Sequence, residues 1–218
     1  MKTFAKKNTR FEIYKKIQFS VFHQPDKVHF EILEAVIKCY ARQRAASVSL
    51  KEISREASIS YPTLKKKFKN VAQIKLEVMS YIRTVFVALV VAYFNEDDSN
   101  REKLQNYILG CFAWIDYLPS HHAGWTYLLR IGLFEPEIRK RNTACVDTGF
   151  ERIKNIIQNG VELQEWHCED VKLVSKKIQL IITAALFSET SENRVSSEYR
   201  SEIFRMCFYD LKPNKNFK

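Results

Sequence analysis

The stretch of sequence that decides the fold is residues 49–70, which read SLKEISREASISYPTLKKKFKN. Ser49 is followed three residues later by Glu52, and such a pair forms a capping box that satisfies two free backbone donors at the start of a helix. The box predicts a short helix that begins at Leu50 and ends at Ala57. Leu50 and Ala57 are two helical turns apart, so both are expected to face the same, inward side.

A second short helix is predicted over residues 61–68, after a three-residue break. Ser60 suits its N-cap, and Pro62 is tolerated because it falls in the first turn, where its missing N–H breaks no helical hydrogen bond. Leu64 and Phe68 lie one turn apart and should point into a small core. Two short amphipathic helices joined in this way predict a helix-turn-helix.

The remainder of the chain predicts further helices and no sheet. Only 5 Gly and 5 Pro occur in 218 residues, too few for the tight turns that hairpins need. Asn70 is expected to cap the helix that follows it. Apolar periodicity predicts the other helices over 28–44, 71–94, 101–118, 121–134, 136–164, 169–189 and 196–210. We therefore expect an all-α fold, in which residues 1–26 form a basic N-terminal extension.

The basic charge gathers in the N-terminal part of the chain. The formal net charge is +10, and residues 1–83 hold 18 Lys and Arg against 7 Asp and Glu. Residues 84–218 hold 17 against 18. A solvated surface usually mixes its charges, so a one-sided cluster indicates a polyanionic partner, either nucleic acid or anionic lipid. The asymmetry alone does not choose between these partners.

The run Lys65–Lys67 has two interpretations. Taken alone, three consecutive lysines favour an ordinary solvated helix face. Their place on the second helix of the helix-turn-helix, inside the basic region, favours DNA instead. A recognition helix puts its N-terminal side chains on base edges, while flanking lysines neutralise phosphates.

Short motifs around these helices match one known family. They are Ile32-Leu33-Glu34-Ala35, Tyr40-Ala41, Ser49-Leu50-Lys51-Glu52-Ile53-Ser54, Glu56-Ala57-Ser58-Ile59-Ser60, Thr63-Leu64 and Phe68-Lys69-Asn70. Together they resemble, without a gap over residues 32–78, the DNA-binding domain of the TetR family of bacterial transcription regulators. The resemblance covers roughly a fifth of the chain. Residues 153–166, followed by Asp170 and an apolar helix, are also similar to the pair of helices through which that family dimerises.

The resemblance implies DNA contacts from both helices. Carried over by position, with flanking lysines added for the phosphates, the contact residues are Ser49, Lys51, Ser60, Tyr61, Thr63, Lys65, Lys66, Lys67 and Lys69. Ser58 and Pro62 stand where the family usually has Gly, whereas Lys65 and Lys67 stand where it has Tyr and His. These departures are expected to keep the affinity for phosphates and to change the geometry at the bases.

The resemblance also implies a ligand-responsive homodimer. Residues 27–75 would form the three-helix DNA-binding domain and residues 76–218 the larger effector-binding and dimerisation domain. A repressor of this kind binds a near-palindromic operator and is released by a small-molecule effector. The pocket candidates are Phe112, Trp114, Tyr117, Trp125, Tyr127 and Phe134. The dimer-interface candidates are Ile178, Ile181, Ile182, Phe204 and Phe208. For both sets plain interior core is the competing interpretation.

Two other functions compete with DNA-binding regulation. The basic, aromatic N-terminus is compatible with a helical interaction protein or a peripheral membrane protein on anionic lipid. A metal-responsive regulator is the second alternative, suggested by the pair His121-His122 and the cluster His167-Cys168-Glu169-Asp170. Neighbouring histidines on a helix diverge, however, and no spaced Cys or His pair occurs, so no metal site is expected.

Catalysis and membrane insertion are not indicated. The chain has no Gly-rich phosphate loop, nucleophile elbow or His-Glu-x-x-His motif, so we expect no enzyme and no cofactor. Its 5 Cys show no paired spacing, which is typical of free thiols in a reducing compartment. No window offers the apolar length of a membrane span, and the N-terminus lacks a signal-peptide pattern. The sequence therefore predicts a cytoplasmic protein.

Overall fold

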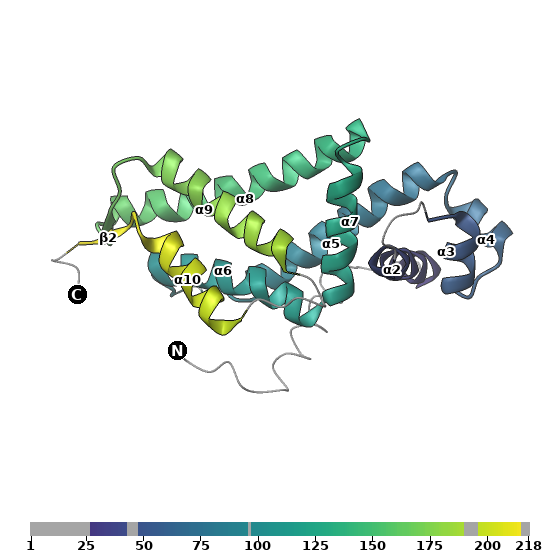
Figure 1. Ribbon diagram of the computed structural model, residues 1–218, viewed down its shortest axis with the longest axis horizontal. Helices are drawn as coiled ribbons and strands as arrows, with labels where there is room; N and C mark the ends of the chain where they lie inside the picture. The colour runs from purple at the N-terminus through teal and green to yellow at the C-terminus, as the bar shows by residue number, and fades with distance from the viewer. Residues whose placement is uncertain (1–26, 43–47, 96, 190–195, 215–218) are drawn as a thin grey trace.

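The computed structural model describes residues 27–42, 48–95, 97–189 and 196–214, and its long elements are all helices (Figure 1). In chain order the elements are α2 (Lys27–Arg42), α3 (Leu50–Glu56), α4 (Tyr61–Lys67), α5 (Val71–Val91), α6 (Asn100–Tyr117), α7 (Pro119–Ile131), α8 (Pro136–Glu162), β1 (Trp166–His167), α9 (Val171–Ser188), α10 (Ser197–Phe208) and β2 (Lys212–Pro213). The expected all-α class is confirmed. The expected basic extension, residues 1–26, lies outside the described residues.

Two local features differ from the sequence expectations. Helix α7 begins at Pro119 and ends at Ile131, because the chain then tightens into a turn in which Phe134 N–H donates to the Ile131 carbonyl at 2.9 Å. Strands β1 and β2 were not predicted; they pair antiparallel, with Trp166 opposite Pro213. Two residues per strand are too few to show the alternation by which strands are recognised.

The helices form an elongated molecule with the helix-turn-helix at one end. Figure 1 shows α3 and α4 at the right, and β2 with α10 toward the left. Helices α5 and α8 extend between these regions, and α7 stands upright and packs against α2. The two short helices are therefore displayed at one end of the molecule, far from the C-terminal helices.

One hydrophobic core holds the helix-turn-helix and continues into the larger helical part. The fully buried Ile53 of α3 and Leu64 of α4 belong to the same cluster as Ile82 of α5 and Leu128 of α7. The cluster thus has members on both sides of the boundary expected at residue 75. As a result, the helix-turn-helix and the larger part share apolar packing instead of meeting at a polar linker.

A second core lies between α6, α8, α9 and α10 and is closed by Trp166. The indole of Trp166 is 2 % exposed, and its Nε1–H donates to the carbonyl of Ile157 at 3.0 Å. Gly160 of α8 faces this ring and leaves room for it. The C-terminal end of α8 is therefore fixed by the fit between one glycine and one buried indole.

Replacement of Gly160 by alanine should destabilise the fold. The added Cβ would lie 2.4 Å from Cε2 of Trp166, and that ring is held by burial and a hydrogen bond. Overpacking of this kind costs about 1–3 kcal/mol. We expect the free energy of unfolding of Gly160→Ala, measured by urea denaturation with circular dichroism, to fall by this amount.

Gly124→Ala is the matched control, since Gly124 is also a buried helical glycine. Its added Cβ would meet Ile82 Cδ1 at 3.5 Å, an ordinary contact, and alanine favours a helix over glycine by about 1 kcal/mol. This variant should be as stable as the parent or more stable. Equal losses in both variants would contradict the proposed fit between Gly160 and the indole.

Candidate nucleic-acid interface and internal cavity

Helix α3 begins as its sequence requires. The Ser49 Oγ accepts from the Glu52 backbone N–H, and the Glu52 carboxylate accepts from the Ser49 N–H at 2.8 Å. The bonds that this carboxylate accepts from the Ser49 N–H and hydroxyl hold the pKa of Glu52 below its ordinary value. The predicted capping box is therefore present, and the exposed Lys51 lies in the first turn that it fixes.

Two hydrogen bonds on its buried side hold the turn between α3 and α4 in place. The buried Ser54 donates its hydroxyl to the Ile59 carbonyl at 2.6 Å, and the Ile59 N–H donates back to the Ser54 carbonyl at 3.1 Å. Ser58 takes a φ of 53°, in the left-handed region that favours glycine. This explains why a glycine is usual at this position in the family that the sequence resembles.

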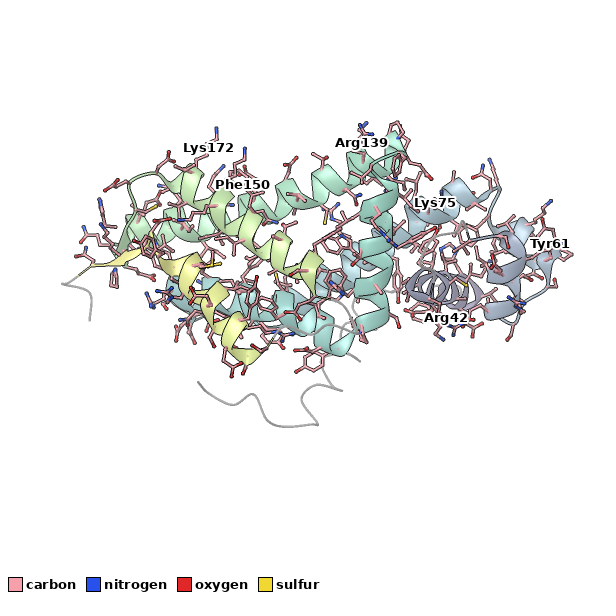
Figure 2. All side chains as sticks on the ribbon, viewed as in Figure 1. Arg42, Tyr61, Lys75, Arg139, Phe150 and Lys172 are labelled. Carbon is pink, nitrogen blue, oxygen red and sulfur yellow. The ribbon has the colours of Figure 1, made fainter. Side chains whose placement is uncertain are left out.

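Helix α4 presents its polar side chains and buries its apolar ones. Ser60 caps it by accepting from the Thr63 N–H at 3.2 Å, as predicted. Leu64 and Phe68 are completely buried. Tyr61, at the N-terminus of the helix, is 38 % exposed and lies at the outer end of the molecule (Figure 2).

The residues predicted to contact DNA form one exposed surface, which we call the α3–α4 surface. Its members are Ser49, Lys51, Ser60, Tyr61, Thr63, Lys65, Lys66, Lys67 and Lys69, and all nine are exposed. Residues 48–70 hold six Lys and Arg against two Glu, so the surface is cationic. Some hydroxyls are already engaged, since Ser60 and Thr63 bond each other at 2.7 Å. A polyanion is the chemical partner that such a surface fits.

A polar contact joins the helix-turn-helix part to the larger part. His121 Nε2 of α7 lies 3.2 Å from Glu34 Oε1 of α2, and the Tyr81 hydroxyl of α5 donates to the same carboxylate. Burial raises the pKa of Glu34, but the facing histidine and tyrosine outweigh it and hold the pKa below its ordinary value. Three helices thus meet on one half-buried carboxylate.

The adjacent histidines diverge, as predicted. His122 points away from Glu34, and its Nε2 lies 2.7 Å from the Leu186 carbonyl; because a carbonyl only accepts, this nitrogen carries the proton. Burial lowers the pKa of His122 despite that bond and the nearby Glu189. Across the described ranges, no three His, Cys, Asp or Glu side chains gather as a metal site requires.

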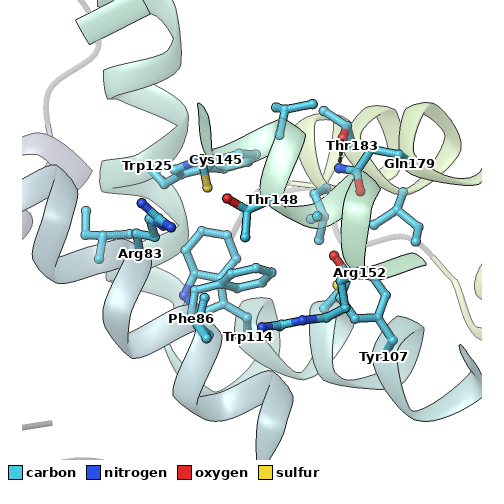
Figure 3. Close-up of a pocket in the computed structure, with 17 residues that line it drawn as sticks. Arg83, Phe86, Tyr107, Trp114, Trp125, Cys145, Thr148, Arg152, Gln179 and Thr183 are labelled. Carbon is cyan, nitrogen blue, oxygen red and sulfur yellow. Dashed lines mark hydrogen bonds between the residues drawn. The ribbon is translucent and has the colours of Figure 1, made fainter. Parts of the chain in front are cut away.

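A partly open cavity of about 60 Å³ lies between α5, α6, α7, α8 and α9 (Figure 3). Its apolar lining is Ile82, Phe86, Val87, Trp114, Trp125, Val146, Ile182 and Leu186. Its polar lining includes Arg83, Tyr107, Thr148, Arg152, Gln179 and Thr183. A mainly apolar lining with a few polar groups is also typical of small-molecule sites.

Two of the six aromatic residues predicted for a pocket, Trp114 and Trp125, line this cavity. The other four, Phe112, Tyr117, Tyr127 and Phe134, do not. Phe134 is 83 % exposed, because the chain turns away after α7, and Tyr127 stacks on a tyrosine of α2. Helical periodicity places residues on a common face, but it does not reveal which face encloses a hollow.

The dimer-interface candidates lie on the inner side of their helices. Ile178 and Ile182 are each 1 % exposed, inside the second core, so these two side chains do not face outward from the chain. Ile181, Phe204 and Phe208 are partly buried against the same core. A different set of apolar side chains faces outward: Leu173, Leu180 and Phe187 on α9, Tyr199 and Met206 on α10, and Tyr209 after it.

The described helices contain no candidate membrane span. None combines the length and apolar character that crossing a bilayer requires.

The fold is shared with solved regulators, although no protein-family profile and no curated protein sequence matches the chain. A TetR transcription regulator from Haloarcula marismortui has a TM-score of 0.77 at 13% identity, over 86% of this chain and 100% of that one. A Rhodococcus sp. protein assigned to the TetR family gives 0.77 at 15%, over 85% and 99%. A protein from Saccharomonospora viridis, assigned as a transcriptional regulator and solved with choline, gives 0.74 at 17%, over 86% and 99%. The chain therefore has a TetR-like fold.

The neutral His122 should make the stability depend on pH. In the unfolded chain this ring takes up a proton near its ordinary pKa of 6.5, whereas burial lowers the pKa in the folded chain. Its contribution to stability is full above pH 6.5 and is lost as the pH falls below that value. Urea denaturation of His122→Gln should show a smaller loss of stability than the parent between about pH 7.5 and 5.5.

The exposed His167 provides the control for this effect. His167→Gln should keep the pH dependence of the parent. If His122→Gln and His167→Gln gave the same dependence as the parent, the burial of a neutral ring at 122 would not contribute to it.

Proposed function

We propose that this chain with a TetR-like fold is a DNA-binding transcription regulator that binds a near-palindromic operator as a homodimer and is released by a small molecule. The observation that carries the proposal is the α3–α4 surface. It combines two capped helices, a fastened turn and an exposed cationic face at one end of the molecule. The net positive charge of this segment is the electrostatic footprint expected for a duplex.

The roles of the side chains follow from their places on α4. Tyr61 and Thr63 lie in its first turn and are exposed, where a recognition helix contacts base edges in the major groove. Lys66 and Lys69 stand further along and carry charges suited to phosphates. Thr63 already shares a hydrogen bond with Ser60, so its methyl group and the bonding capacity that its hydroxyl does not use there are what it offers to a base.

Homodimerisation is supported by the outward apolar side chains of α9 and α10. Leu173, Leu180 and Phe187 recur every seven residues and are 63 %, 59 % and 46 % exposed, which places them in one stripe along α9. Tyr199 and Met206 form a similar pair on α10. Contact of these surfaces with those of a second copy would create the two-fold symmetry that a near-palindromic operator matches.

The cavity supports release by a ligand because its walls belong to the core that holds α4. Ile82 and Trp114 line the cavity and are members of the same cluster as Leu64 and Phe68. Displacement of α5 by a ligand would therefore be transmitted to the helix-turn-helix through close packing. The contact of Glu34 with His121 is a second connection between the two parts.

The experiment that tests the proposal is selection from a random pool of duplex DNA with the purified protein at near-physiological salt. Enrichment of one inverted repeat is the expected result. Salt-sensitive retention without a motif would mean binding to the backbone alone. Absence of retention would overturn the proposal and would favour an interaction or membrane role for the basic N-terminal part.

Substitutions on α4 should separate specificity from affinity. Tyr61→Ala and Thr63→Ala should reduce discrimination between the selected repeat and random duplex by about fivefold to a hundredfold, because they remove contacts to bases. Lys66→Ala and Lys69→Ala should weaken binding to both duplexes and lower the salt slope by about 1. Fluorescence anisotropy over a salt series measures both quantities. Unchanged discrimination in the first pair would contradict the placement of α4 in the groove.

Leu180→Glu should convert the homodimer to a monomer, because it puts a charge in the centre of the exposed stripe on α9. Light scattering coupled to size-exclusion chromatography measures the mass. Leu163→Glu is the matched control, since Leu163 is also an exposed leucine, at 62 %, but lies outside the stripe. A dimer that survives Leu180→Glu would place the interface elsewhere.

A further inference from the structure

The charged side chains that line the cavity are cations. Arg83 reaches toward it from α5 and Arg152 from α8 (Figure 3). No described residue that lines the cavity is an Asp or Glu, and neither guanidinium forms an ion pair with a described residue. Two cations beside an apolar hollow favour an anionic ligand, and guanidinium groups match the geometry of a carboxylate.

Two buried polar atoms of the lining have no hydrogen-bond partner among the residues that the structure describes. Gln179 is 9 % exposed; its Nε2 donates to Thr183 Oγ1 at 3.0 Å, and its Oε1 accepts nothing. Trp114 is 2 % exposed, and its Nε1–H donates to nothing. Buried polar groups in folded proteins are nearly always hydrogen-bonded. A ligand that brings one donor and one acceptor would satisfy both atoms.

The apolar walls suit a flat ring. The ring centroids of Phe86 and Trp114 are 4.7 Å apart, and those of Trp114 and Trp125 are 5.3 Å apart. The volume of about 60 Å³ is smaller than the roughly 150 Å³ of a cavity that holds benzene. A single ring therefore enters only if side chains of the lining shift. Phe86 and Trp125 are half-buried, so they are the aromatic side chains of the lining that can shift.

We propose that the ligand of this cavity is a small aromatic carboxylic acid with a hydroxyl donor on its ring. The carboxylate is held by Arg83 and Arg152, the ring lies against Phe86 and the two tryptophans, and the hydroxyl donates to Gln179 Oε1. The inference rests on the proposed function in one respect, namely that the cavity is the effector site. It adds the chemical class of the effector.

Isothermal titration of the full chain with three probes tests the class. The probes are para-hydroxybenzoate, its neutral amide para-hydroxybenzamide, and the cation choline. The acid should bind about a hundredfold more tightly than the amide, as expected for two lost charge-assisted pairs of about tenfold each, and choline should not bind. Equal affinity for acid and amide would overturn the proposal, as would binding of none of the probes.

Variants then assign the residues. Arg152→Gln and Arg83→Gln should each reduce the preference for acid over amide by about tenfold. Arg141→Gln is the matched control, because Arg141 is also on α8 but donates to Ser80 outside the cavity. Gln179→Leu should remove the advantage of para-hydroxybenzoate over benzoate. Retention of the acid preference in both cavity arginine variants would overturn the assignment even if the acid binds.

The same preparations separate this inference from the proposed function. Binding of the acid by a protein that enriches no DNA motif would support the ligand class and refute the regulator. An enriched motif with no binding of the acid would leave the regulator standing and refute the ligand class. If both hold, addition of para-hydroxybenzoate to the protein–DNA complex should lower the anisotropy of the labelled duplex.

Discussion

The structure depends on helix α2 being buried on two sides at once. Ile32, Val36 and Ile37 are inaccessible to solvent, and Tyr40 is 2 % exposed. One side packs on α3 and α5, and the other packs on α7. A surface helix usually buries a single stripe, so this arrangement makes α2 the wall that the helix-turn-helix and the larger part share. The position of α4 relative to the cavity follows from that shared wall.

Local signals in the sequence predict most of the fold. Ser49, Ser60 and Asn70 cap the helices for which their side-chain chemistry suits them, because a cap depends on residues only three positions apart. The resemblance over residues 32–78 likewise predicts the TetR-like fold that the solved structures share. Strands β1 and β2 escape prediction, since their pairing joins residues far apart in the chain.

The sites are only partly predictable, for a physical reason. Exposure of the residues on α4 follows from its periodicity, since only Leu64 and the following Phe68 turn inward. The cavity depends instead on how five helices approach one another, and its cations, Arg83 and Arg152, carry no motif. On α9 the sequence shows two apolar sides. Periodicity favours the buried side of Ile178 equally with the exposed side of Leu180, and packing alone distinguishes them.

The fastened turn between α3 and α4 has a mechanical consequence. The paired bonds between Ser54 and Ile59, together with a left-handed serine at 58, leave the joint little freedom to change its angle. If the chain binds DNA as proposed, a stiff turn would not adapt the angle of α4 to an imperfect groove, and the duplex would have to deform instead. Flexible pyrimidine–purine steps near the contacts would bend at low energetic cost, whereas rigid tracts would not. The elasticity of the double helix would then decide between sites whose contacted bases are identical.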